Sequence, residues 1–504
     1  MSIKKRILAV AAASALGAMA AVPAMAFENE FHGSYTLKYF LSNYERGAEG
    51  NGVITPGVAY ANATQNLKTN NYFEQRARIF YTAKANDDLK LVTAFEIDSV
   101  FGDRAQGSIA ATNSNVAQSN VTAGFRNSGG AMESDAVNLE TKWVYLQFKV
   151  PSTPTTVIAG IQPFKDSIKG IFLDADIAGV ITSTKLNNAT LNAGYLRAYD
   201  QSYFSASSGQ TNLVRGNENL DIGAVELKYA LSKDANVGGA YYIYADGRTN
   251  YVSGAENGST MVHVIALTGD AKIGKVALSG FGAYQGGVIR GVTTQGDSAY
   301  LNAFAYNVAA KAAVGPGTLR SALLFTSGNA NNPGKHYTGW VGVMQSPNST
   351  WSSTNGANSY NESGMMLFNR NAGAQGTSTD SSLVYNSGNG TSPINGQGLY
   401  LYTLGYDATI TPKAFASANV GLGWAAHTNS LKPTDKSLTG SPKNASNFMG
   451  TEINVETGYK MYDNLTAKIQ AAYLVLGGYY AKSATGGKDP ENPYTGRVVL
   501  SYAF

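Results

Sequence analysis

Charged side chains recur at every second position in two neighbouring segments of the sequence. The first segment carries Glu74, Arg76 and Arg78, and the second carries Glu96 and Asp98. In an extended chain a spacing of two puts side chains on one face. A turn centred on Asp87 would place Arg78 opposite Glu96 and Arg76 opposite Asp98. Such cross-strand pairs stabilise a sheet by a few tenths to about 1 kcal/mol. The chemistry these residues predict is therefore ion pairing along one wall.

Further charged residues alternate with apolar ones elsewhere and are candidates for the same wall, which we expect to line a wet channel. They are Glu226, Lys228, Arg320, Asp407, Glu452, Glu456, Lys468 and Arg497. Cations and anions nearly balance in this set, so we expect a transverse field across a lumen and only weak selection by charge sign. For each single residue the alternative is a structural salt bridge or a charge at a rim.

A short apolar segment from residue 163 to residue 175 carries four more charges, Lys165, Asp166, Lys169 and Asp174. Its apolar anchors suit a constriction loop that folds onto an inner wall. The rival for this role is the long segment 328–398 with Trp340 and Trp351. For that segment we favour an exposed, variable surface cap.

The sequence shows no catalytic, cofactor or metal-binding motif. The segment 269–275 matches most of a phosphate loop, but Val276 stands where a Ser or Thr is needed and the pattern is strand–turn–strand. Cysteine is absent, which removes thiolate metal sites and covalently attached haem. The four histidines are isolated, with no ligand spacing: His32, His263, His336 and His427. We expect no enzyme and no cofactor, unless partners far apart in the sequence converge.

The elements that would position these charges are about 18 alternating segments of about ten residues, joined in pairs by short turns. Gly/Asn/Ser/Thr-rich connections separate the pairs. Short turns at one end and long loops at the other are typical of outer-membrane barrels. Counts of 16 and 20 stay open, because 328–398 has room for a further hairpin. We expect strands at 31–41, 71–84, 89–99, 137–149, 155–162, 176–186, 190–199, 221–231, 235–245, 261–271, 275–285, 300–311, 318–327, 399–410, 414–426, 450–461, 465–476 and 494–504.

Apolar stripes run along the faces opposite the charges. One comprises Tyr400, Tyr402, Leu404, Tyr406 and Ala408. Tyrosines near strand ends suit the aromatic girdles of a membrane barrel. The predicted fold class is an all-β, transmembrane, antiparallel up-and-down β-barrel, and the alternative is a large soluble sandwich or propeller.

Both ends of the chain agree with export to an outer membrane. Lys4, Lys5 and Arg6 precede an apolar stretch that ends in Ala24-Met25-Ala26, which predicts a signal peptide over 1–26 and one barrel domain over 27–504. Its removal takes away three cations and no anion, so the formal charge of +4 becomes about +1. This balance argues against nucleic-acid binding. The last strand ends on Tyr502 and Phe504, which look like the assembly signal of such barrels.

Several short motifs resemble a known group of proteins. They are the opening Phe27-Glu28-Asn29-Glu30-Phe31-His32-Gly33, the strand pair around Arg76-Ala77-Arg78 and Glu96-Ile97-Asp98, the turn Val150-Pro151-Ser152-Thr153-Pro154, and Gly160-Ile161-Gln162-Pro163-Phe164. Together they resemble the abundant outer-membrane porin of Geobacter-type metal-reducing bacteria and its porin-like relatives. The resemblance implies a porin for small hydrophilic solutes and ions, trimeric like many porins, in an organism that respires extracellular metal.

These observations lead us to expect a passive diffusion channel in the bacterial outer membrane, with weak charge selectivity. The expected partners are outer-membrane lipids and lipopolysaccharide, the barrel-assembly machinery and a homotrimer. Two alternatives stay open: a surface scaffold or adhesin that supports extracellular electron-transfer components, and a solute-specific channel.

Overall fold

The computed structural model of the chain describes residues 28–43, 69–101, 139–200, 219–247, 260–290, 298–329, 335–343, 360, 362, 364–368, 398–427, 446–481, 489 and 491–504. In this part of the chain, no helix is long and apolar enough to cross a membrane.

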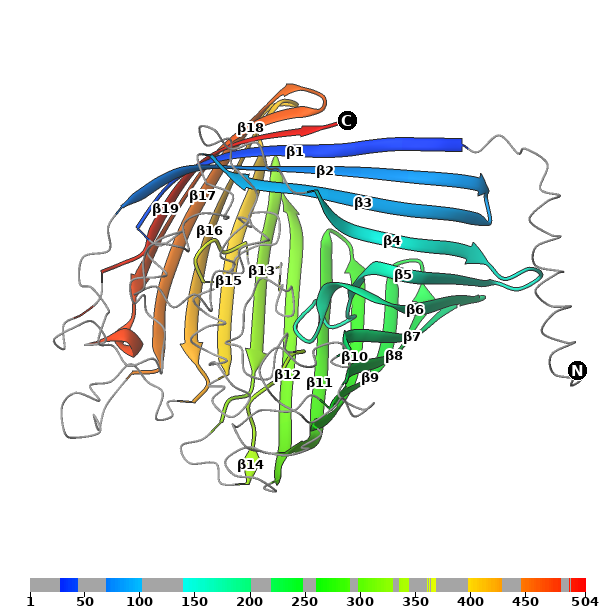
Figure 1. Cartoon of the computed structure of the whole chain (residues 1–504). Coiled ribbons are helices and arrows are strands. Elements are labelled where there is room, and N and C mark those ends of the chain that lie inside the picture. The colour runs from blue at the N-terminus through cyan, green and yellow to red at the C-terminus, as the bar shows by residue number, and fades with distance from the viewer. Residues whose placement is uncertain are drawn as a thin grey trace, which may run out of the picture.

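The described residues form one sheet, shown in Figure 1, whose strands follow one another in chain order. Its strands are β1 (Glu28–Ser42), β2 (Asn70–Asn86), β3 (Leu89–Val100), β4 (Glu140–Lys149), β5 (Thr155–Lys165), β6 (Asp174–Leu186), β7 (Ala189–Asp200), β8 (Asn219–Ser232), β9 (Ala235–Asp246), β10 (Thr260–Ile273), β11 (Val276–Arg290), β12 (Ser298–Val314), β13 (Gly317–Thr326), β14 (His336–Tyr337), β15 (Leu399–Thr409), β16 (Ala414–Ala425), β17 (Phe448–Tyr462), β18 (Leu465–Leu476) and β19 (Tyr494–Ala503); a single 3-10 turn, Gly478–Tyr480, follows β18.

The sheet closes on itself into a barrel. The last strand, β19, pairs antiparallel with β1 from Ser34 opposite Ala503 to Ser42 opposite Thr495, and it lies beside β1 in Figure 1. The wall consists of 18 antiparallel strands, β1 to β13 and β15 to β19, because β13 pairs directly with β15. The prediction of an antiparallel barrel of about 18 strands is confirmed, and every expected strand overlaps an observed one.

The two-residue strand β14 is an addition that the sequence did not suggest. It pairs parallel with β12, His336 opposite Tyr300 and Tyr337 opposite Leu301. The ladder between β12 and β13 begins only at Ala305. The short strand β14 therefore continues the pairing of β12 beyond the end of β13.

Short turns join neighbouring strands at one end of the barrel. Asn187 and the turn glycines Gly274 and Gly315 take the positive φ that tight turns require, at 49°, 61° and 56°. The start of β1 lies at this end too, because Glu28 is opposite Lys84 next to the β2–β3 turn, and so does the end of β19. The long connections at the other end fall largely outside the described residues. We call the two ends the turn end and the loop end.

The outer face of the wall is apolar, as the period-two stripes predicted. Along β15, Tyr400, Tyr402 and Leu404 are 37–39 % exposed, whereas Leu399 and Leu401, which alternate with them, are each 1 % exposed. Large exposed apolar side chains occur in the same alternating way along β8, β10, β12, β17 and β18. The opposite, inner face carries the buried residues.

The seam between the first and last strands contains a close contact at Gly33. The main chains of Gly33 and Phe504 exchange two hydrogen bonds, of 2.8 and 3.1 Å. A Cβ at residue 33 would lie 2.5 Å from both the Arg78 carbonyl oxygen and the Phe504 ring atom Cζ. The Phe504 ring also stacks on Tyr502, with centroids 5.7 Å apart. Glycine at residue 33 therefore leaves the space that the terminal aromatic ring occupies.

Replacing Gly33 with alanine should weaken closure of the barrel, because the Arg78 backbone and the Phe504 ring must both move. Overpacking of this kind costs about 1–3 kcal/mol. Gly282→Ala is the matched control, since a Cβ there meets nothing within 4 Å. The measurement is the temperature at which the refolded barrel loses its fast mobility on SDS gels. A Gly33 variant as heat-resistant as the Gly282 variant would contradict the role of this contact.

Candidate functional site

The charges that the sequence placed on β2 and β3 meet across the strands in the expected register. Arg78 is opposite Glu96, and Arg76 is opposite Asp98. Arg76 donates two hydrogen bonds of 2.6 Å to the two Asp98 carboxylate oxygens, and its Nη2 also lies 3.6 Å from Glu96 Oε1. Arg78 donates to Glu96. We call these four residues the charged strip; the bidentate contact between Arg76 and Asp98 fixes the geometry of that pair.

Other predicted wall charges also form cross-strand pairs on the inner face. Arg320 donates to Asp407 at 2.5 and 2.9 Å. The pair Lys228–Asp270 is 3.4 Å apart, and Lys468–Glu456 is 3.7 Å apart. These pairs lie on β8, β10, β13, β15, β17 and β18, so charge is distributed around the wall.

Four predicted lining residues are buried, which corrects the expectation that they face open water. Glu74, Glu452 and Arg497 are 2 % exposed or less, and Glu96 is 8 % exposed. Glu74 pairs with the buried Lys38 at 3.8 Å, and the Arg497 guanidinium lies 5.4 Å from the centroid of the Phe40 ring. Glu452 is covered because residues 366–368 pack on it, which period-two reasoning cannot detect.

The segment between β5 and β6, residues 166–173, is one of the parts that pack on the inner wall. Asp166 accepts hydrogen bonds from the backbone N–H groups of Gly170, Phe172 and Leu173, at 2.7, 2.8 and 2.6 Å. Full burial raises the pKa of the Asp166 carboxyl to about 6, although the three backbone donors oppose that rise. Asp166 is therefore an internal clamp of the segment, with its carboxylate turned away from solvent.

The other three charges of this segment lie at its tip and its base. Lys169 sits at the tip with a φ of 66°, and its amine donates to Ser279, Asn307 and Glu362 at 3.0, 2.6 and 2.6 Å. Burial lowers the pKa of Lys169, against the effect of Glu362. At the base, Lys165 pairs with Asp174 at 2.7 Å. The four constriction candidates thus hold the segment together and attach it to β11 and β12.

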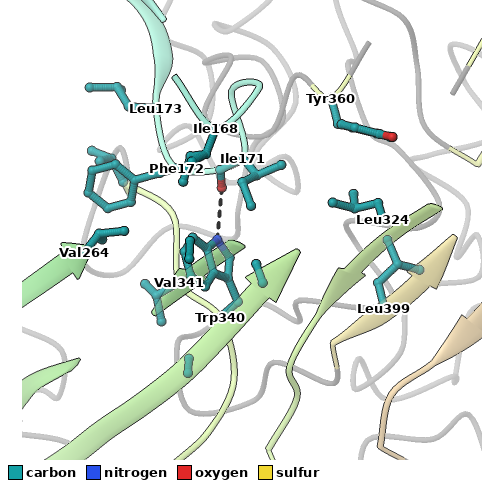
Figure 2. Packing of buried hydrophobic residues seen from close by; sticks show 14 of the residues in the cluster. Ile168, Ile171, Phe172, Leu173, Val264, Leu324, Trp340, Val341, Tyr360 and Leu399 are labelled. Atoms are coloured by element: carbon teal, nitrogen blue, oxygen red, sulfur yellow. Dashed lines mark hydrogen bonds between the residues drawn. The ribbon is translucent and has the colours of Figure 1, made fainter. Parts of the chain in front are cut away.

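The wall side chain Glu226 reaches the same segment. It accepts a 2.5 Å hydrogen bond from the Tyr242 hydroxyl and a 3.0 Å bond from the Ser167 backbone N–H. The apolar side chains of the segment, Ile168, Ile171, Phe172 and Leu173, are all 2 % exposed or less. Figure 2 shows them facing Val264 of β10 and Trp340, whose Nε1 donates to the Ile171 carbonyl at 3.2 Å. These contacts agree with a segment packed on the inner wall.

Parts of the segment 328–398 also pack inside, so our preference for an exposed cap there was wrong for the described residues. Trp340 is 3 % exposed, and Tyr360, Leu367 and Phe368 are 1 % or less. They belong to the same apolar cluster as Phe172. The other tryptophan considered, Trp351, lies outside the described residues.

Neutral amide side chains anchor residues 335–343. Gln285 of β11, fully buried, donates to the Val341 carbonyl at 2.6 Å and accepts from the Val341 N–H at 2.9 Å. Asn329 accepts from the N–H groups of Thr338 and Gly339, both at 2.7 Å. These amide side chains satisfy backbone N–H and C=O groups of the segment that pair with no neighbouring strand.

Glu452 on β17 anchors residues 364–368. Its carboxylate accepts from three consecutive backbone N–H groups, those of Met366, Leu367 and Phe368, at 2.6, 3.1 and 2.7 Å. Successive N–H groups that converge in this way form a nest for an anion. The neighbouring Asn454 donates to the Gly364 carbonyl at 3.0 Å.

Two glycines of β16 complete the socket for this segment. A Cβ at residue 421 would lie 2.3 Å from Met365 Sδ, and one at residue 423 would lie 3.2 Å from Phe368 Cζ. Met365 and Phe368 therefore occupy space that any larger side chain at Gly421 or Gly423 would take. The wall of β16 and β17 is shaped to receive residues 364–368.

Sequence reasoning missed the amide anchors Gln285, Asn307, Asn329 and Asn454, because it followed charge alone. A signal was present in β10, where Val262, Val264 and Ala266 on one face and Ile265 and Leu267 on the other are all apolar. A membrane-barrel strand that is apolar on both faces needs a cover on its inner side. No group of three or more His, Cys, Asp or Glu side chains in the described part of the chain is arranged to hold a metal ion.

No family model matches the sequence, and no curated protein does. Solved structures with a similar course of the chain include OccK9 (OpdG) of Pseudomonas aeruginosa, OccAB1 of Acinetobacter baumannii and a BenF-like porin of Pseudomonas fluorescens Pf-5. They are 12 %, 10 % and 12 % identical, with TM-scores of 0.49, 0.49 and 0.48, over 94–95 % of this chain and 96–98 % of theirs. At this degree of likeness they carry no argument about function, so we base the barrel architecture on the strand pairing of this chain.

Proposed function

We propose that this chain forms a channel through the bacterial outer membrane for passive diffusion of small hydrophilic solutes and ions. The observation that carries the proposal is the closed 18-strand wall, apolar outside and lined inside by partly exposed ion pairs. Strand number sets the width of a barrel, and this number is in the range that leaves an aqueous channel. Large barrels of this kind occur in outer membranes. The expected signal peptide over 1–26 would direct the export that this location requires.

The charge on the inner wall supports weak selection by sign. The charged strip contains two arginines and two carboxylates, so its formal charge is zero. The pairs Arg320–Asp407 and Lys468–Glu456 are balanced too. An ion of either sign meets its counter-charge along such a wall.

The packed inner segments favour a second candidate, a solute-specific channel. The lumen is narrowed by residues 166–173, 335–343, 360, 362 and 364–368. Many hydrogen bonds hold these residues in place, which an unselective wide pore does not need. The proposed partners stay those of an outer-membrane barrel: lipid, lipopolysaccharide, the assembly machinery and two further copies in a trimer. A link to extracellular metal respiration rests on the resemblance alone and would be indirect, since the chain contains no cysteine for haem attachment.

Single-channel recording of the refolded protein in planar bilayers tests the proposal. We expect an ohmic current that rises in proportion to the KCl concentration and a reversal potential close to zero in a KCl gradient. A saturating current with one class of solute would favour the solute-specific channel. A folded, inserted barrel that passes no current would refute both the diffusion channel and the solute-specific channel. The surface scaffold or adhesin would then be the favoured function.

A further inference from the structure

We propose that Arg320 is a positioning residue for the inner segment 364–368, which it holds in its socket through the side chains of Asn419 and Asn454. The inference rests on the proposed channel function, in which this segment narrows the lumen. It is carried by a continuous set of hydrogen bonds that joins Arg320 to Glu452. We call Arg320, Asn419, Asn454 and Glu452 the polar network.

The sheet register brings the polar network together on the inner wall. Arg320 of β13 is opposite Gly405 of β15, which is opposite Asn419 of β16. Asn419 is in turn opposite Asn454 of β17. Glu452 lies two residues from Asn454 on β17 and therefore on the same face. Residues from strands that lie side by side in Figure 1 thus form one row across the wall.

The glycine of β15 allows Arg320 and Asn419 to meet. Arg320 Nη2 donates to Asn419 Oδ1 at 2.8 Å, although β15 lies between their two strands. A Cβ at residue 405 would lie 2.1 Å from Asn419 Oδ1 and 3.2 Å from Arg320 Nη2. Any side chain at Gly405 would therefore occupy the space in which the two residues make their hydrogen bond.

The hydrogen bonds of the polar network all run in one direction. A guanidinium group only donates, and a carboxylate only accepts. Between these two ends, Asn419 Nδ2 donates to Asn454 Oδ1 at 2.8 Å, and Asn454 Nδ2 donates to Glu452 Oε1 at 3.0 Å. If either amide turned over, its N–H₂ group would face a donor and its oxygen would face an acceptor. Arg320 and Glu452 together therefore fix the orientation of both amides.

The segment 364–368 begins directly above these amides. Asn454 Nδ2 also donates to the Gly364 carbonyl at 3.0 Å. A Cβ at residue 364 would lie 3.2 Å from Asn419 Oδ1 and 3.3 Å from Arg320 Nη1. Asn419 and Asn454 are 9 % and 1 % exposed, so an amide that turned over would leave buried polar groups unsatisfied. Loss of Arg320 should therefore reach the segment through Asn419 and Asn454.

Accessibility of an introduced thiol tests this role, because the chain contains no cysteine of its own. Met365→Cys places the thiol in the socket, since Met365 is 0 % exposed and lies against Gly421. The measured quantity is the rate at which a water-soluble maleimide modifies this thiol in refolded barrels that show heat-modifiable mobility. The labelling needs no current, so failure of the proposed channel function would not affect its outcome.

In the Met365→Cys background, Arg320→Met and Gly405→Ala should each raise the labelling rate about tenfold, because each removes the donor that orients Asn419. The double variant should be no faster than either single variant, since both changes break the same hydrogen bond. Asp407→Asn is the matched control. It removes the charge that pairs with Arg320 but leaves the bond to Asn419 in place, so its labelling rate should stay close to that of the background.

Unchanged labelling in either folded single variant would overturn the positioning role of Arg320. Equal acceleration by Asp407→Asn would overturn it too, because the ion pair with Asp407 would then be the contact that matters. An additive effect in the double variant would show that Arg320 and Gly405 act separately and would also contradict the proposal.

Discussion

Replacement of Glu452 with alanine is expected to raise the single-channel conductance about twofold and to make the current noisy, because a larger open cross-section conducts more. The change leaves three consecutive buried N–H groups, those of residues 366–368, without their acceptor. An unsatisfied buried donor costs about 1–3 kcal/mol, so the loss of the acceptor favours departure of the segment from its socket into water, where the three N–H groups find new partners. Its departure uncovers the inner face of β16 and β17. The measurement is the conductance histogram of refolded protein in symmetric KCl.

Two variants control this experiment. Glu452→Gln keeps one side-chain oxygen as an acceptor, so its single-channel conductance should lie between those of the wild type and of Glu452→Ala. Glu456→Ala removes a carboxylate from the same inner face of β17, four residues away, where it bonds to Gln470 at 2.5 Å and touches no inner segment in the described structure. Its conductance should stay close to wild type. If Glu452→Ala refolds and conducts like wild type, apolar packing alone holds residues 364–368 in place.

Reversal of the charge at Arg78 should shift the reversal potential in a KCl gradient towards cations. The wild-type strip is neutral, and Arg78→Glu changes it by two charges in a confined space where few ions screen them. Arg78→Gln changes it by one charge, so its shift should be smaller and of the same sign. Arg78 is the better target than Arg76, because Arg76 carries the bidentate bond to Asp98 and its loss would also loosen the strip.

Arg197 provides the matched control for this prediction. It too is an arginine that bonds to a carboxylate, Asp221 at 2.9 Å, but it alternates with the fully buried inner-face residue Leu196 and so lies on the outer face of β7. Arg197→Gln should leave the reversal potential unchanged. An equal shift from Arg197→Gln and Arg78→Gln would mean that the measurement reports general surface charge, and no shift from Arg78→Glu would remove the strip from the constriction.

The wall of the barrel was predictable because local rules determine it. The period of two separates Tyr400 and Tyr402 from Leu399 and Leu401, and a turn at Asp87 sets the register that joins Arg78 to Glu96. Short turns and alternating strands leave little freedom in such a sheet. Strand boundaries therefore moved by only a few residues between expectation and structure.

The interior was less predictable because its contacts join residues that are distant in the sequence. Glu452 holds residues 366–368, and Gln285 holds Val341. From the sequence, Glu452 was one more inner-face charge, and the composition around 335–368 indicated a surface loop. Asp166 lies in the segment that the sequence predicted to fold inward, but its backbone contacts could not be anticipated from spacing. The apolar inner face of β10 is the sequence feature that could have indicated that other parts of the chain pack on the inner wall.

The interlocking of the inner segments also constrains the order in which the molecule can mature. Residues 166–173 pack on β8 to β12 and on Trp340, so these elements must be in place first. Residues 364–368 likewise depend on the carboxylate of Glu452. Contacts that close such large loops form late, because their entropic cost must be met before they stabilise the chain. We therefore expect the barrel wall to form first, around a wider lumen. The inner segments should pack only after β17, which carries Glu452, has joined the sheet.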